Sequence, residues 1–175
     1  MKSLKKLGIL LLTTIFLNTL SSCSKDDDGG SGGAAAEGTI TAKVDGTTVS
    51  SETMLTTGVL IGTGSASTLT LQGTNTAGKG YQIIINGYEG VGTYEIGGTS
   101  SVFVVGNYIE SNVSNPSATQ TWAAPFDDTV AGQLQISSAT SSKVIGTFNF
   151  TGKNTENNTT KTISEGSFNV NLTTF

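Results

Sequence analysis

The stretch Thr39-Ile40-Thr41-Ala42-Lys43-Val44-Asp45-Gly46 decides the fold that we expect for this chain. Its apolar residues fall at every second position, and this alternation places them together on one face of a β-strand. The Asp-Gly pair that follows favours a type I′ turn, because both central residues of that turn need a positive φ. The stretch therefore predicts a strand with one buried face that leads directly into a hairpin.

The same alternation recurs along the rest of the chain. It is seen in residues 68–72, 81–86, 102–109, 130–136, 144–150 and 168–172. Beyond the N-terminal segment, no window has apolar residues at helical spacing among helix-forming neighbours. We therefore expect an all-β protein: a single antiparallel β-sandwich or barrel-like domain of about eight to ten strands. This domain is expected to span residues 38–175.

A short motif occurs three times within the expected strands. It reads Gly, hydroxyl residue, aromatic, polar, apolar, and it begins at Gly92, Gly146 and Gly166. The glycine, the aromatic residue and the apolar residue share one face of the strand. A glycine there admits a neighbouring aromatic ring or a tight bend, so we interpret the motif as core packing.

Residues 1–22 have the pattern of a secretory signal peptide. Lys2, Lys5 and Lys6 precede an apolar run over residues 7–17. That run is too short for a membrane-spanning helix, which needs about 20 apolar residues, and it suits the central part of an export signal.

The export segment ends in Leu20-Ser21-Ser22-Cys23, which resembles the bacterial lipobox. The resemblance implies cleavage before Cys23, diacylglycerol on its thiol and an acyl chain such as palmitate on the new amine. Several acyl chains together form a lasting membrane anchor, whereas one chain is marginal. The alternative is an ordinary cleaved signal that leaves a free thiol, and Cys23 is the only cysteine of the chain.

Residues 23–37 are expected to form a flexible tether, because they are rich in Gly, Ser and Ala. Lys25, Asp26, Asp27 and Asp28 follow the cysteine closely. This cluster resembles the surface-export signal of Bacteroidetes lipoproteins, which implies display on the outer face of the outer membrane. The alternatives are a cluster that only solvates the tether and a domain that faces the periplasm.

Composition limits the chemistry of the expected domain. The chain has no His, and all nine of its basic residues are Lys. These absences exclude the usual zinc sites, His-based catalytic triads and bidentate Arg clamps, and we expect no cofactor and no metal. Removal of residues 1–22 takes away three lysines and changes the formal charge from −4 to −7. Such an acidic surface disfavours nucleic acid and tolerates neutral sugars, cations or basic proteins.

Carboxylates are the remaining candidates for acid–base chemistry. A glycosidase needs two of them about 5 to 10 Å apart across a cleft. Asp127 and Asp128 are adjacent in a polar turn, where a calcium ion is an alternative, although the spacing is not that of an EF-hand. We interpret the carboxylates as solvated groups, and we expect that the protein is not an enzyme. The candidates in the expected domain are Asp45, Glu52, Glu89, Glu95, Glu110, Asp127, Asp128, Glu156 and Glu165.

Residues 110–128 are interpreted as a long loop, and long loops often carry function. Asn112, Asn115, Gln120 and Trp122 are its candidate ligand contacts. An exposed Trp beside amides suits stacking on a neutral sugar ring. We favour a second interpretation, in which Trp122, the only Trp, folds back and plugs one end of the barrel.

Asp128-Thr129-Val130 resembles the Bacteroidetes O-glycosylation signal, which is Asp, then Ser or Thr, then an aliphatic residue or Thr. The resemblance implies a glycan on Thr129. A pattern of three residues also arises by chance, and this alternative stays open.

An ordered set of pieces extends the resemblance over residues 39–172: residues 41–46, 92–94, 132–136, 146–150 and 164–168. Together with the lipobox they resemble a family of uncharacterised Bacteroidetes, largely flavobacterial, surface lipoproteins with a domain of unknown function. The resemblance implies the fold class and the outer-membrane location, but no activity and no catalytic residues.

We expect a surface-tethered, non-catalytic binding or interaction domain, with a neutral glycan or another extracellular ligand as its partner. The first alternative is a structural or accessory lipoprotein of the cell envelope. The second is a hydrolase that uses a carboxylate pair.

Overall fold

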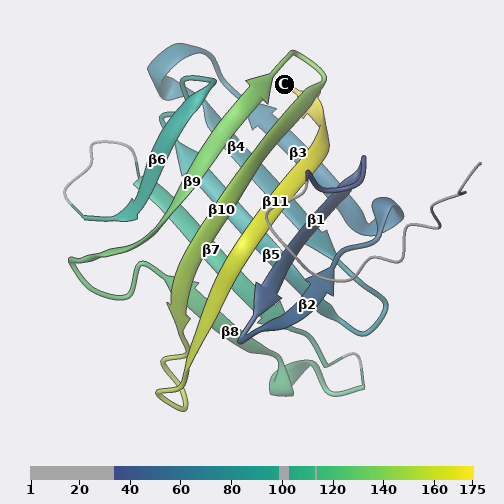
Figure 1. Ribbon diagram of the computed structural model, residues 1–175, viewed down its shortest axis with the longest axis vertical. Helices are drawn as coiled ribbons and strands as arrows, with labels where there is room; N and C mark the ends of the chain where they lie inside the picture. Colours follow the sequence, from purple (N-terminus) through teal and green to yellow (C-terminus); the bar gives the residue numbers. More distant parts are fainter. Residues whose placement is uncertain (1–33, 99–102, 113) are drawn as a thin grey trace, which may run out of the picture.

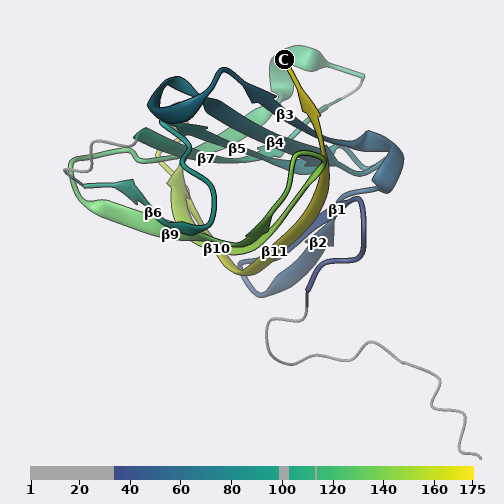
Figure 2. The ribbon, with the colours of Figure 1, turned by 90° about the horizontal axis from the view of Figure 1, so that it is seen from above.

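The computed structural model describes residues 34–98, 103–112 and 114–175, and its strands form two layers that face each other (Figures 1 and 2). The first layer is, in order, β6 (Gly92–Gly97), β9 (Val130–Ala139), β10 (Lys143–Lys153), β11 (Thr160–Thr174), β1 (Thr39–Val44) and β2 (Thr47–Ser50). The second layer is β3 (Thr56–Ile61), β4 (Thr68–Thr74), β5 (Lys79–Asn86), β7 (Phe103–Glu110) and β8 (Gln120–Ala124). Short 3₁₀ turns lie at η1 (Thr53–Leu55), η2 (Gly64–Ala66) and η3 (Pro116–Ala118).

Hydrogen bonds also join the two layers at two corners. The end of β11 pairs in parallel with β3, with Leu172 opposite Gly58, and the end of β10 pairs with β8 through Lys153 and Ala123. The β10–β8 pair and the remaining strand pairs are antiparallel. The molecule is thus a sandwich that is partly closed like a barrel, which confirms the expected all-β class. The described residues contain eleven strands, slightly more than the eight to ten expected.

The first predicted hairpin is confirmed. β1 and β2 pair directly across Asp45 and Gly46, which have φ values of 49° and 84°. These are the two positive φ angles that a type I′ turn needs. The Asp45 carboxylate also accepts a hydrogen bond from the backbone N–H of Thr162, at 2.9 Å, which ties the turn to β11.

The core lies between the two layers and consists of the apolar face of each strand. Tyr81 of β5 is 1% exposed, and its hydroxyl donates to the carbonyl oxygens of Ala42 and Val49 in the opposite layer, at 3.3 and 3.0 Å. Burial raises the pKa of Tyr81 far above its usual value, so this hydroxyl stays a donor at neutral pH. The side chain therefore links the layers by a polar contact inside an apolar core.

Two of the repeated glycines receive aromatic rings from the neighbouring strand. Gly146 of β10 lies opposite Phe168 of β11, and Phe148 of β10 lies opposite Gly166 of β11. A Cβ atom at Gly166 would come within 2.8 Å of the Phe148 ring, and one at Gly146 would overlap the Phe168 ring. The interpretation of the motif as core packing at β10 and β11 is therefore confirmed.

Residues 34–37, here called the strap, lie against the outer side of the first layer. Ala35 is 5% exposed, and its carbonyl oxygen accepts a hydrogen bond from the Asn169 side chain at 3.4 Å. Glu37 pairs with Lys143 at 2.6 Å. The end of the expected tether is thus part of the folded domain. Within the described ranges, no helix is long and apolar enough to cross a membrane.

Candidate functional site

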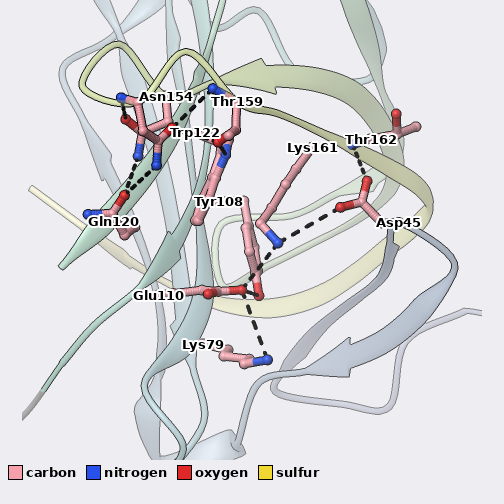
Figure 3. A network of polar contacts seen from close by, with 11 residues as sticks. Asp45, Lys79, Tyr108, Glu110, Gln120, Trp122, Asn154, Thr159, Lys161 and Thr162 are labelled. Atoms are coloured by element: carbon pink, nitrogen blue, oxygen red, sulfur yellow. Dashed lines mark hydrogen bonds and ion pairs between the residues drawn. The ribbon is translucent and has the colours of Figure 1, made fainter. Parts of the chain in front are cut away.

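Polar and aromatic side chains gather at one end of the sandwich, where the β1–β2 turn, the end of β7 and the β10–β11 hairpin meet (Figure 3). We call this group the end cluster. It includes the only Trp of the chain and a lysine between two carboxylates. Its members are Asp45, Lys79, Tyr108, Glu110, Gln120, Trp122, Asn154, Asn157, Thr159 and Lys161.

Lys161 lies at the centre of the end cluster. Its ammonium nitrogen is 4.6 Å from the centroid of the Trp122 ring and 5.7 Å from that of Tyr108. It is also 3.5 Å from a Glu110 carboxylate oxygen and 3.8 Å from one of Asp45. The lysine side chain is 22% exposed, so both its charge and its methylene stem contribute to the packing.

Tyr108 connects the core to this charged group. Its ring contacts Trp122, with the centroids 5.8 Å apart, and its hydroxyl donates to a Glu110 oxygen at 2.9 Å. Burial, and then the hydrogen bond to the carboxylate of Glu110, raise the pKa of Tyr108 far above its usual value. The tyrosine is therefore a fixed hydrogen-bond donor at neutral pH, which leaves it unsuited to act as a base.

Trp122 lies in β8 and is 5% exposed. Its ring N–H donates to the Thr159 hydroxyl oxygen at 3.0 Å. The interpretation of residues 110–128 as one long loop is wrong, because residues 120–124 form a strand that pairs with β7. An exposed stacking ring at Trp122 is wrong for the same reason: alternation within the strand turns this side chain inward. The buried position agrees with the plug, which is the interpretation that we favoured.

Gln120 supports the β10–β11 hairpin. Its amide oxygen accepts hydrogen bonds from the side chains of Asn154, at 2.8 Å, and Asn157, at 2.9 Å. Asn154 is 2% exposed, and its own oxygen accepts from the backbone N–H groups of Glu156 and Asn157. The Gln120 oxygen therefore holds two side chains of the hairpin in place.

Asn112 and Asn115 lie on the exposed segment between β7 and β8. The Asn112 side chain accepts a hydrogen bond from the Asn115 backbone N–H at 2.9 Å, which is a local turn contact. Trp122 is buried, so it does not share an exposed binding surface with either residue. Both side chains are exposed.

Thr129 is exposed in the segment between β8 and β9. Its hydroxyl and its backbone N–H both donate to an Asp127 carboxylate oxygen, at 2.6 and 2.9 Å. These two hydrogen bonds lower the pKa of Asp127. Asp127 thus closes a local turn. Among the residues described, no group of three or more His, Cys, Asp or Glu side chains could hold a metal ion.

The charges of the end cluster satisfy one another. Lys161 and Lys79 both pair with Glu110, and Lys161 also pairs with Asp45. Glu110 and Asp45 keep 33% and 53% of their side-chain surface exposed, so they are not a buried, facing carboxylate pair. This arrangement is suited to closing and stabilising the end of the sandwich.

Sequence reasoning missed Lys161 and Thr159 as partners of Trp122, and it missed Asn154 as a partner of Gln120. Each lies more than thirty residues away along the chain, and lysines and amides in a polar hairpin look like solvated residues. One signal was available: Trp122 needs a partner for its ring N–H when it is buried. That requirement predicts an acceptor but does not say which residue supplies it.

Fold and site together define an all-β sandwich domain. One end of the sandwich is closed by the end cluster, whose aromatic and charged side chains contact one another. The family model described as a domain of unknown function, DUF6252, matches residues 37–170, and the chain belongs to that family. No curated protein and no solved structure matches the chain. Cys23 and the cluster from Lys25 to Asp28 lie outside the described residues.

Proposed function

We propose that this protein is an outer-membrane lipoprotein, displayed on the surface of a Bacteroidetes cell, whose domain binds an extracellular partner without catalysis. The observation that carries the proposal is the position of the only cysteine. Cys23 directly follows a positively charged and apolar export segment. A lone cysteine is otherwise unexpected in an exported protein.

The balanced end cluster supports a non-catalytic role. Its carboxylates, ammonium groups and tyrosine hydroxyl are engaged with one another, so the cluster serves to hold this end of the domain together. An acidic, sparsely charged domain suits a neutral glycan or another extracellular ligand rather than nucleic acid.

Replacement of the anchor residue tests the location. We expect Cys23→Ser to release the domain from the membrane fraction, while the unchanged protein pellets with membranes. Ser22→Ala serves as the matched control, because it keeps a small residue before the cysteine. If Cys23→Ser still pellets with membranes, the anchor is not at this residue.

A protease added to intact cells tests surface display. We expect it to remove the domain, and we expect alanines at Lys25, Asp26, Asp27 and Asp28 to preserve lipidation while they reduce that removal. Full protection of the unchanged protein on intact cells, but not on lysed cells, would place the domain in the periplasm instead.

A structural or accessory role in the cell envelope is the second candidate, and one observation favours it. Trp122 is buried, so the aromatic platform first considered for a sugar is absent from that position. Cross-linking on intact cells separates the two roles, because an accessory subunit is captured with a fixed protein partner. A binding domain instead interacts with added glycan.

A glycan on Thr129 is also proposed, from the Asp128-Thr129-Val130 pattern and the exposed position of Thr129. Mass spectrometry of the protein from its native cells should find added sugar mass that Thr129→Val removes. An unmodified peptide containing Thr129 would refute this proposal.

A further inference from the structure

The outer side of the second layer differs from the rest of the surface because it carries no charge. The strands β3, β4, β5, β7 and β8 contain two charged residues, Lys79 and Glu110. Both belong to the end cluster, because they occupy the inward-facing positions at the strand ends. Among the described residues, every outward position of these five strands is therefore uncharged. We call this surface the neutral face.

Cross-strand register arranges the neutral face in parallel rows. Val59, Thr70, Ile84 and Val105 form one row across β3, β4, β5 and β7. All four are partly exposed. A mostly aliphatic row thus runs across four strands at the surface.

The adjacent row carries amide groups. Gln72, Gln82 and Asn107 lie opposite one another on β4, β5 and β7. The Asn107 amide nitrogen donates to the Gln82 oxygen at 3.1 Å, which fixes the orientation of both side chains. Apolar contact area and hydrogen-bonding groups therefore lie side by side on the outer face of this layer.

The opposite outer face has a different character. Lys43 pairs with Glu165 there, and Lys143 pairs with Glu37 of the strap. The strap contacts β10 and β11, and Figure 2 shows these strands in the layer opposite β3, β4, β5 and β7, so the neutral face and the strap lie on opposite sides of the sandwich. In the anchored protein of the proposed function, the neutral face therefore lies on the side of the domain opposite the one that the tether joins.

We propose that the neutral face binds a neutral, extended polysaccharide. This inference rests on the proposed function and names its site and ligand class. Sugar rings offer apolar C–H faces and hydroxyl groups, which match the aliphatic and amide rows. Binding of an uncharged ligand to this surface does not require any charged group to lose its hydration shell. The acidic remainder of the domain repels anionic polymers.

The size of the face favours a narrow ligand over a folded protein. Five strands spaced about 4.8 Å apart, each about six residues long, cover roughly 20 Å by 20 Å, or about 400 Å². Stable protein complexes bury about 800 Å² on each partner. A second copy of the domain would need contacts beyond the face, whereas an extended chain does not.

Affinity electrophoresis of the full-length protein in mild detergent tests the site. The native gels contain dextran, laminarin, galactomannan or no polysaccharide. We expect retardation by at least one of these neutral polymers, and we expect Ile84→Lys to weaken it by about tenfold or more. The matched control is Ile145→Lys, which makes the same change on a partly exposed residue of the outer face of β10. The control should keep the retardation of the unchanged protein.

Gln82→Ala, which adds no charge, is the second variant in case Ile84→Lys does not fold, as judged by circular dichroism. Retardation that both variants leave intact would overturn the neutral face as the site while supporting glycan binding. No retardation in any gel would overturn both the site and the glycan-binding role. A dimer in sedimentation that Ile84→Lys alone dissociates would also overturn the proposal, because a second copy would then occupy the face.

Discussion

Gly92 and Gly146 begin the same five-residue motif, yet alanine should have opposite effects at the two positions. A Cβ atom at Gly146 would overlap the carbonyl oxygen of Gln135 and the ring of Phe168. At Gly92, on edge strand β6, the nearest atom would be in the Tyr94 ring, 3.8 Å away, which is an ordinary contact. Neither glycine has a positive φ, so the backbone accepts alanine at both.

The expected magnitudes follow from these contacts. Overpacking against a fixed backbone carbonyl group costs about 1–3 kcal/mol, so Gly146→Ala should destabilise the domain by about that amount. Gly92→Ala should be neutral or stabilise it by about 0.4–1 kcal/mol, because alanine reduces the entropy of the unfolded chain. For a domain of this size, 1 kcal/mol corresponds to about 3 °C in Tm. The two variants should therefore differ in Tm by about 4 °C or more.

Thermal unfolding of both variants and the unchanged protein, followed by circular dichroism in one buffer, measures this difference. Urea unfolding gives a second estimate of the free energy of unfolding, and an unchanged m-value would show that the unfolded state is comparable. Equal changes in Tm for Gly92→Ala and Gly146→Ala would refute the reasoning. The cross-strand contact of Gly146 with Phe168 would then not limit the residue at that position.

Further predictions concern the end cluster and the strap. Trp122→Ala should lower the free energy of unfolding, measured in urea, by about 3–5 kcal/mol. In the unchanged protein, the fluorescence of the buried Trp122 should move to longer wavelength on unfolding. Lys161→Met should cost about 1–2 kcal/mol, more than Lys43→Met at an exposed ion pair, and an equal effect would show that the ring contacts are unimportant. The hydrogen bond and charge of Lys143 lower the pKa of Glu37 below its usual value of 4.5. The Glu37–Lys143 pair therefore contributes fully to the stability of the folded domain above pH 4.5, and this contribution is lost as the pH falls through the lowered pKa of the folded state. NMR titration should show this lowered pKa, and Lys143→Met should restore the usual one.

Local patterns predicted the strands well where alternation is strong. The β1–β2 hairpin and its type I′ turn follow from residues 39–46, because turn geometry and side-chain alternation are properties of neighbouring residues. β8 was missed since only Trp122 and Ala124 of its five residues face the core. A strand that short has too few alternating positions to be distinguished from a loop.

The candidate site could be predicted only in part. Trp122 was recognised as unusual, but whether it was exposed depended on the pairing of β8 with β7. Its contacts with Thr159 and Lys161 come from the β10–β11 hairpin, far along the chain. Contacts of this kind leave no periodic signal in the sequence.

By itself, the sequence determined the all-β class, the position of the first hairpin and two of the glycines that receive aromatic rings, Gly146 and Gly166, because these depend on steric preferences and on alternation along single strands. Only the tertiary structure decided that β11 pairs in parallel with β3, that β3, β4, β5, β7 and β8 lie together in one layer with uncharged outward positions, and that Lys161 covers Trp122. These features depend on which strands meet. That choice is made by the packing of the whole core, in which residues distant in sequence compete for the same neighbours.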